Sequence, residues 1–282
     1  MNRSDIKKIL QVNELAPKKK LGQNFLVHQA TAERIVELAE VGPADTIIEI
    51  GVGLGSLTLP LCHRAGRVIG IEFDSGIIKY HQNNRLLPGN VQIIHQDVLK
   101  TDFAQLALEH GAPLKIIANL PYSISNPLLF KLLEHRDIMA WAVLMLQKEV
   151  GQRLCAAPGT KEYGVLSVLF SECATVKNLM QISPEQFHPR PKVDSVVVKI
   201  TFHPGGTEQD YNSELLVKLV KTGFQKRRKT LINCLAASPL VSLSKEQAAW
   251  ALEQAGLSET IRGEALTIAD YIRLTRVVEG LL

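Results

Sequence analysis

The feature that most constrains the fold is an apolar segment that runs directly into a glycine-rich turn. Thr46 to Ile50 has the β-branched, apolar composition of a buried strand, and Gly51-Val52-Gly53-Leu54-Gly55 follows it without a break. Ser56 to Ala65 then has a helical pattern. A strand, a glycine turn and a helix in this order let the backbone approach a nucleotide-like ligand closely. We therefore expect an α/β fold with a ligand site where this strand ends.

The spacing of the glycines indicates which cofactor the turn suits. A dinucleotide-binding fingerprint would have its third glycine where Ser56 stands. The G-x-G-x-G form favours S-adenosylmethionine, which has no pyrophosphate for the helix end to hold. A second strand, Arg67 to Ile71, ends in Glu72, about twenty residues past the first glycine, where an acid can accept hydrogen bonds from ribose hydroxyls. Alternatively, Glu72 and Asp74 cap a helix that follows.

Two further strands end in residues that can contact an adenine ring. Val91 to His95 precedes Asp97, whose carboxylate can accept from an adenine amino group. Leu114 to Ala118 leads into Asn119-Leu120-Pro121-Tyr122. Pro121 favours an extended residue before it, so that the Leu120 carbonyl and the Asn119 side-chain oxygen can point the same way. Two acceptors suit an exocyclic amine, and Tyr122 offers a flat face for a base. Alternatively, this tetrapeptide is a strand end followed by a proline turn.

The last strands of the sheet enclose a loop stiffened by proline. Ile138 to Gln147 is expected as a fifth strand, and Val176 to Ile182 and Val193 to Phe202 as two closing strands. The Val-rich second of these has the weak alternation of a half-buried antiparallel strand. The loop between the closing strands begins at Phe187. Phe187 either fills the core or forms the second wall of a slot whose first wall is Tyr122.

A polar, glycine-containing segment, Pro204 to Asp210, is the expected domain boundary. Beyond it the pattern is wholly helical, with helices expected over 213–224, 229–237, 245–255 and 268–281. The sequence therefore predicts a larger α/β domain over residues 1–203 and a small all-helical domain over residues 204–282.

Basic residues gather at two places. The arm of residues 1–22 carries six basic side chains against two acidic ones, and Lys18, Lys19 and Lys20 lie next to one another within it. A second block consists of Lys226, Arg227, Arg228 and Lys229. Such clusters are either solvated faces or contacts for a phosphate backbone.

Composition excludes several classes of protein. No apolar run reaches the roughly eighteen residues of a membrane span, and the charged start from Arg3 lacks a signal-peptide core. The 4 cysteines form no C-x-x-C pair, and no H-E-x-x-H occurs, so neither a disulfide framework nor a metal site is expected. We expect a reduced, cytoplasmic protein.

From about Lys19 to its carboxyl end, the chain resembles the ribosomal RNA adenine dimethylase family. The motifs that carry the resemblance occur in order: Gly22-Gln23-Asn24-Phe25-Leu26, Glu49-Ile50-Gly51, Glu72-Phe73-Asp74, Asp97, Asn119-Leu120-Pro121-Tyr122, Met145 to Val150, and Phe187 to Ser195. The resemblance implies a seven-stranded Rossmann-like methyltransferase sheet with its last strand antiparallel. It also implies methyl transfer from S-adenosylmethionine, without a metal, to N6 of two adjacent adenosines in a small-subunit (16S) rRNA hairpin late in subunit biogenesis. The implied partner is the small ribosomal subunit, not a membrane, and we expect a monomer.

The resemblance also assigns roles to individual residues. Those implied to contact the cofactor are Asn24, Leu26, Gly51, Gly53, Glu72, Asp97 and Asn119. Those implied to hold the adenine are Asn119, Leu120, Tyr122 and Phe187, and both basic clusters are implied to contact RNA. The chain departs from the family pattern at Val52, where Pro is usual, and at Asn126, where Thr or Ser is usual.

Other functions remain open at this stage. A large-subunit rRNA adenine methyltransferase of the antibiotic-resistance type shares the chemistry, but the segment from Gly223 to Leu231 resembles the small-subunit group. DNA adenine methyltransferases usually carry an acid where Asn119 stands. A ribosome-assembly factor for which methylation is secondary is a third reading. A nicotinamide oxidoreductase is a fourth, against which Ser56 and the Asn119–Tyr122 tetrapeptide argue.

Overall fold

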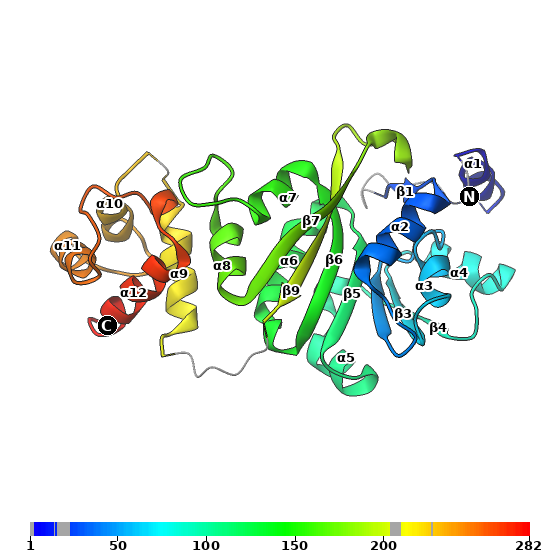
Figure 1. Cartoon of the computed structure of the whole chain (residues 1–282), viewed down its shortest axis with the longest axis horizontal. Coiled ribbons are helices and arrows are strands. Elements are labelled where there is room, and N and C mark those ends of the chain that lie inside the picture. Colours follow the sequence, from blue (N-terminus) through cyan, green and yellow to red (C-terminus); the bar gives the residue numbers. More distant parts are fainter. Residues whose placement is uncertain (1–2, 14, 16–22, 204–209, 227) are drawn as a thin grey trace. The chain divides into compact units, whose positions relative to one another are not determined.

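A computed structural model describes residues 3–13, 15, 23–203, 210–226 and 228–282 (Figure 1). The chain divides into two compact units: Met1–Gly151 with Thr175–Pro204, and Gln152–Ala174 with Gly205–Leu282. Residues 152–174, which we expected in the first domain, therefore lie in the second unit. Tertiary hydrogen bonds hold them there, because the Tyr163 hydroxyl donates to the Leu266 carbonyl at 2.9 Å and the Tyr211 hydroxyl donates to Glu172 at 2.7 Å.

The first unit contains a 7-stranded sheet with the strand order β4-β3-β2-β5-β6-β9-β7. Its strands are β2 (Thr46–Ile50), β3 (Arg67–Glu72), β4 (Val91–His95), β5 (Leu114–Asn119), β6 (Met139–Gln147), β7 (Ala174–Ile182) and β9 (Ser195–Phe202). The strands from β4 to β6 pair in parallel, whereas β9, the last strand in the chain, runs antiparallel to β6. This sheet, together with the helical second unit, confirms the predicted fold class.

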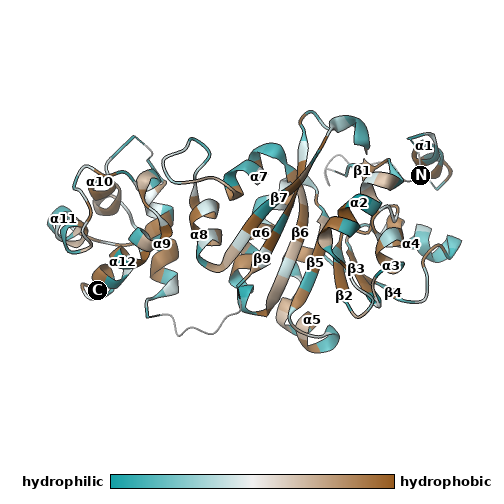
Figure 2. Ribbon diagram, in the orientation of Figure 1, coloured by the Kyte–Doolittle hydropathy of each residue, from teal (hydrophilic) through white to brown (hydrophobic). Residues whose placement is uncertain are grey.

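The sheet is stable because its strands are apolar along most of their length, as the brown colour of β2, β3 and β5 shows in Figure 2. One hydrophobic cluster joins Ile47, Ile117 and Val143 of the sheet to Ile35 and Leu61 of two helices. The expectation that the last strand is half-buried was wrong. Six of the eight residues of β9 are buried, because the strand lies between β6 and β7 and not at an edge.

Helices connect the strands of the first unit: α1 (Arg3–Val12), α2 (Gln29–Ala39), α3 (Thr58–Cys62), α4 (Ser75–Asn84), α5 (Phe103–His110), α6 (Ser125–Glu134) and α7 (Lys148–Leu154), the last of which crosses into the second unit. The helix expected from Ser56 begins later, at Thr58. Pro60 explains the difference, because it has no N–H to donate and is tolerated only in the first turn of a helix.

A second, 2-stranded sheet pairs β1 (Phe25–Leu26) with β8 (Phe187–His188) in antiparallel register. Leu26 lies opposite Phe187, and the Val27 N–H extends the pairing by donating to the Gln186 carbonyl at 2.8 Å. The proline loop predicted from the sequence is thereby held against the segment that follows the basic arm.

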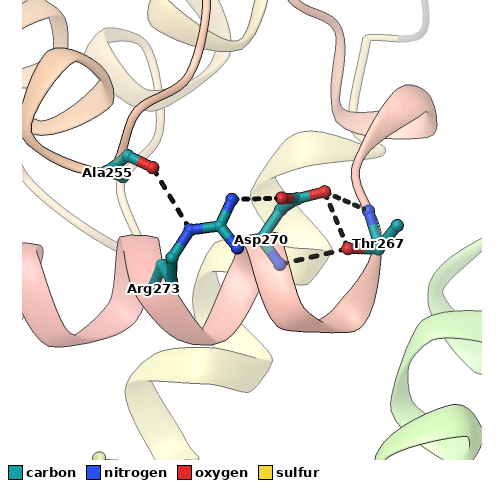
Figure 3. Close-up of polar contacts among 4 residues, drawn as sticks. All are labelled: Ala255, Thr267, Asp270 and Arg273. Carbon is teal, nitrogen blue, oxygen red and sulfur yellow. Dashed lines mark hydrogen bonds and ion pairs between the residues drawn. The ribbon is translucent and has the colours of Figure 1, made fainter.

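The second unit is helical: α8 (Val165–Cys173), α9 (Ser213–Gly223), α10 (Leu231–Ala236), α11 (Lys245–Gln254) and α12 (Ile268–Glu279). The last four lie within two residues of their predicted bounds. A capping box starts α12, in which the Thr267 hydroxyl accepts from the Asp270 N–H and the Asp270 carboxylate accepts from the Thr267 N–H (Figure 3). Arg273 donates both to Asp270, at 2.5 Å, and to the carbonyl of Ala255 at the end of α11, at 3.3 Å. Over the residues described, no helix combines the length and the apolar character that crossing a membrane requires.

Candidate active site

A cavity of about 240 Å³ lies where β2, β3, β4 and β5 end. In an open α/β sheet, this carboxyl edge is where ligands bind. The cavity is lined by Gln23, Asn24, Phe25, Ile50, Gly51, Gly53, Ile71, Glu72, Phe73, Ile77, Gln96, Asp97, Val98, Leu99, Asn119, Pro121, Ser123 and Ile124. Six of the seven residues implied to contact the cofactor are among them. Leu26 is the exception, because its side chain is packed in the hydrophobic core.

The glycine turn lines the cavity with backbone. Gly51, Gly53 and Gly55 have φ angles of 80°, 53° and 84°, which only glycine adopts without strain. A Cβ atom on Gly51 would lie 3.6 Å from the Asn119 carbonyl oxygen, and one on Gly53 would lie 3.4 Å from the Phe25 ring. The turn therefore needs glycine for its conformation, whereas a Cβ atom at Gly51 or Gly53 would make only ordinary van der Waals contacts.

Glu72 ends β3 inside the cavity wall. Its Oε2 accepts from the Gly53 N–H at 3.0 Å, and its Oε1 accepts from the Asp74 N–H at 2.8 Å. Burial raises the pKa of Glu72, although these N–H donors act in the opposite direction. The capping role that we considered for this region belongs to Asp74, which accepts from the Gly76 N–H at the start of α4. Glu72 thus holds the glycine turn and can accept a further hydrogen bond from a ligand.

Asp97 and Phe73 line the same cavity with different chemistry. Asp97 follows β4, and its Oδ1 accepts from the Leu99 N–H at 2.9 Å, which fixes the carboxylate at the start of a 3-10 turn. Phe73 is 55% exposed, although it is aromatic and follows a buried strand. A carboxylate and an exposed aromatic ring that line one cavity can bind the amine and the plane of an adenine.

Asn119 is oriented by a hydrogen bond from its own amide group. Its Nδ2 donates to the Asn24 carbonyl at 3.0 Å. Because a carbonyl can only accept, the amino end of the side chain must face Asn24, and Oδ1 is left as an acceptor. The sequence predicted an acceptor oxygen here but gave no indication of the partner that orients it.

The remaining residues of the predicted adenine slot do not line the cavity. Leu120 is 2% exposed, although its neighbours Asn119 and Pro121 both line the cavity. Tyr122 is half-buried, and its hydroxyl pairs with the buried Ser195 Oγ at 2.8 Å. Burial raises the pKa of this phenol. Phe187 is 1% exposed and belongs to the core cluster, because its pairing with Leu26 covers it.

The predicted RNA contacts fall partly outside the described residues. Lys18, Lys19, Lys20 and Arg227 all lie there. Lys226, Arg228 and Lys229 are exposed in the second unit, in the connection between α9 and α10.

Several lining residues were given no role in the sequence analysis, although two of them lie within the quoted motifs. The clearest is Phe73, whose position directly after Glu72 was a usable signal. Gln23 also lines the cavity, and its side chain donates to Asp74 at 3.1 Å. Ile77 comes from α4, the helix that the capping alternative for Glu72 and Asp74 implied, and nothing in the sequence pattern connects it to the cavity.

The lining fits S-adenosylmethionine. Glu72 and Asp97 supply acceptors for ribose hydroxyls and an adenine amine, Phe73 and Val98 supply apolar surface for the ring, and the glycines allow close backbone approach. The strand order, the glycine turn and these acids define a Rossmann-like, S-adenosylmethionine-dependent methyltransferase.

Comparison with known proteins gives the family. The model of the family described as "Ribosomal RNA adenine dimethylase" matches residues 15–279. A ribosomal RNA small subunit methyltransferase A from Desulfotalea psychrophila is 51% identical, with 98% of this chain and 95% of the relative covered. Its namesake from Alkaliphilus metalliredigens is 41% identical, with coverage of 98% and 96%. The chain therefore belongs to the ribosomal RNA adenine dimethylase family.

Solved structures agree with this assignment. A dimethyladenosine transferase from Plasmodium falciparum has a TM-score of 0.75 at 28% identity, covering 89% of this chain and 95% of that one. The 23S rRNA methyltransferase ErmE has a TM-score of 0.64 at 22% identity, covering 90% and 99%, and shows a shared fold.

Proposed function

We propose that the protein transfers methyl groups from S-adenosylmethionine to N6 of two adjacent adenosines in a hairpin of 16S rRNA, giving N6,N6-dimethyladenosine late in small-subunit biogenesis. The observation that carries this proposal is the orientation of Asn119. Its amide nitrogen donates to Asn24, so that its oxygen remains an acceptor at the edge of the cavity that fits the cofactor.

The cofactor site is formed by the glycine turn and the acids of the next two strands. When bound, S-adenosylmethionine supplies an electrophilic methyl group on a positively charged sulfur. Glu72 would accept from the ribose hydroxyls, and Asp97 would accept from the adenine amine of the cofactor. Phe73, which is 55% exposed, provides the ring face against which that adenine packs.

The target amine needs activation, because its lone pair is delocalised into the adenine ring. In the first transfer, Asn119 Oδ1 and the Leu120 carbonyl accept the two hydrogens of the amine and favour a pyramidal nitrogen, which localises the lone pair as attack begins. In the second transfer, the one remaining hydrogen is accepted in the same way. This stabilisation is strongest in the transition state, where it accelerates the reaction. The methylated nitrogen is acidic, so its proton passes to water and no strong base from the protein is required.

Tyr122 supplies the stacking face for the flipped base. Its hydrogen bond with Ser195, at 2.8 Å, sets the direction of the ring, and stacking offsets part of the few kcal/mol that unstacking a base costs. Phe187 serves as the second wall only if its ring leaves the core, because it is 1% exposed in the β1–β8 pairing.

The exposed basic residues of the second unit are the proposed contacts for the phosphate backbone. Lys226, Arg228 and Lys229 lie on one connection between two helices. Cations at such spacing neutralise neighbouring phosphates without reading sequence, so they position the RNA and leave base recognition to the first unit.

The test is a methylation assay with S-adenosylmethionine carrying a labelled methyl group. Small subunits that lack the modification, small subunits that already carry it, and large subunits are incubated separately, and the rRNA is digested to nucleosides. We expect label in N6,N6-dimethyladenosine from the unmodified small subunits alone. Label confined to large-subunit rRNA, or to any other nucleoside, would reject the proposal.

A further inference from the structure

Helix α4, whose Ile77 lines the cavity, also contacts the glycine turn. Its residue His81 places Nε2 2.7 Å from the carbonyl oxygen of Gly53. The N–H of the same glycine donates to Glu72 at 3.0 Å. Both polar backbone groups of Gly53 are therefore tied to side chains, one from β3 and one from α4.

The chemistry of the pair fixes the tautomer of the imidazole. A carbonyl oxygen can only accept, so Nε2 of His81 carries the hydrogen and Nδ1 does not. His81 is 4% exposed, and its buried Nδ1 has no hydrogen-bond partner among the described residues. Burial also lowers the pKa of His81, which keeps the ring neutral. The ring is therefore a neutral donor directed at one backbone oxygen.

The surroundings of His81 fit it closely. The Tyr80 ring lies edge-on, with a centroid distance of 5.1 Å. A Cβ atom on Gly55 would lie 3.3 Å from the Cε1 atom of His81. The missing side chain of the third glycine thus gives the imidazole the room to approach Gly53.

A turn rich in glycine requires such support, because glycine loses more conformational freedom on ordering than any other residue. Three of its five residues have positive φ, a conformation that a free glycine segment leaves readily. Groups that hold a site in its bound conformation raise affinity by reducing the ordering that binding requires. A donor to the Gly53 carbonyl acts in this way.

We propose that His81 is a positioning residue, which holds the glycine turn in its cofactor-binding conformation through the hydrogen bond from Nε2 to the Gly53 carbonyl. This inference rests on the proposed function, because it takes S-adenosylmethionine as the ligand of the turn. It adds a residue that belongs to no motif quoted above and that does not line the cavity.

The test compares two substitutions by calorimetric titration with S-adenosylhomocysteine. His81→Gln retains an N–H donor at a similar reach, whereas His81→Met retains bulk without a donor. We expect His81→Met to bind about 5- to 10-fold more weakly, as the loss of one hydrogen bond predicts, and His81→Gln to stay within about twofold of the parent. In steady-state kinetics, KM for S-adenosylmethionine should rise in His81→Met while kcat at saturation is retained.

His110→Met is the matched control, because His110 is also a histidine with a side chain only 6% exposed, on a helix of this unit, but it does not line the cavity. It should leave the affinity unchanged. Equal affinity of His81→Met and the parent would overturn the proposal, and so would equal weakening of both His81 variants. The ring ¹⁵N shifts of the parent give a test that needs no variant: a hydrogen on Nδ1 in place of Nε2 would overturn it. If the parent itself failed to bind S-adenosylhomocysteine, the proposed function would fail, which is a distinguishable result.

Discussion

Replacement of Asn119 by alanine separates the two roles that the structure gives this side chain. The amide nitrogen donates to the Asn24 carbonyl at 3.0 Å, and the oxygen is the proposed acceptor for the target amine. Asn119→Ala removes both the donor and the acceptor. The two losses affect different measurements. Loss of the donor affects the cavity, and so cofactor binding, whereas loss of the acceptor affects the transition state, and so the rate of methyl transfer.

The magnitudes decide which loss dominates. Removing a neutral hydrogen bond costs about 0.5–1.5 kcal/mol, so cofactor affinity should fall by less than about tenfold. Removing one preorganised polar group that acts on the reacting atoms costs about 10²- to 10³-fold in kcat, or roughly 2.7–4 kcal/mol. The expected signature is therefore a large loss of methyl transfer with cofactor binding mostly retained.

The assay is single-turnover methylation of unmodified small subunits, accompanied by titration of the same variant with S-adenosylhomocysteine. Asn126→Ala is the matched control. It makes the same chemical change seven residues further along the chain, at an exposed position in α6 that does not line the cavity. We expect that control to react at the parent's rate.

Two outcomes would refute the reasoning. Methylation by Asn119→Ala within about fivefold of the parent would show that the oxygen does not act on the amine, since about 1 kcal/mol is too little for a transition-state contact. A loss of cofactor binding as large as the loss of rate would show that Asn119 serves the cavity and not the reaction.

Three further predictions concern other parts of the molecule. Tyr122→Phe keeps the ring but loses the contact with Ser195, so kcat/KM should fall by about fivefold or less, whereas Tyr122→Ala should lose about 1–3 kcal/mol of stacking; equal losses would argue against a stacking role. When Lys226, Arg228 and Lys229 are changed together to Gln, the slope of log RNA affinity against log salt concentration should become shallower by about 2. An unchanged slope in filter binding would place the RNA elsewhere. Burial raises the pKa of Glu49 from the ordinary carboxyl value of 4.5 to about 8, so its contribution to stability is full below pH 4.5 and is lost as pH rises through the folded pKa. In urea unfolding, the free energy of unfolding of the parent should fall by a few kcal/mol between about pH 5 and pH 8, and Glu49→Gln should not show this fall. Parallel pH curves for the two proteins would contradict this account.

The strands were predictable because short apolar runs bounded by turn residues leave little choice of structure. Thr46–Ile50 and Val91–His95 have the predicted bounds, and β5 extends by one residue into Asn119. Which strands lie next to each other in a sheet cannot be predicted from such local patterns. The burial of β9 depends on its insertion between β6 and β7, and the pairing of β1 with β8 joins segments about which periodicity says nothing.

The cavity was predictable where a motif ends a strand and less so where tertiary packing decides. Gly51, Glu72, Asp97 and Asn119 each follow or end a predicted strand, and parallel strands bring such ends to one edge. Ile77 was missed because an apolar residue gives no local signal of whether it lines a cavity or fills a core, whereas the position of Phe73 directly after Glu72 was a signal that we did not use. The same ambiguity applies to Phe187: the sequence allowed it to fill the core or to form a wall of the adenine slot, and in this structure it lies in the core.

The central claim is that the tip of β5 presents a target adenine to the cofactor cavity. The most direct test is a crystal structure of the protein with S-adenosylhomocysteine and the small-subunit hairpin. It should place the cofactor against Gly51, Gly53 and Glu72, with adenine N6 at about 2.7–3.2 Å from Asn119 Oδ1. An adenine bound away from Asn119, or a cofactor outside this cavity, would contradict the account.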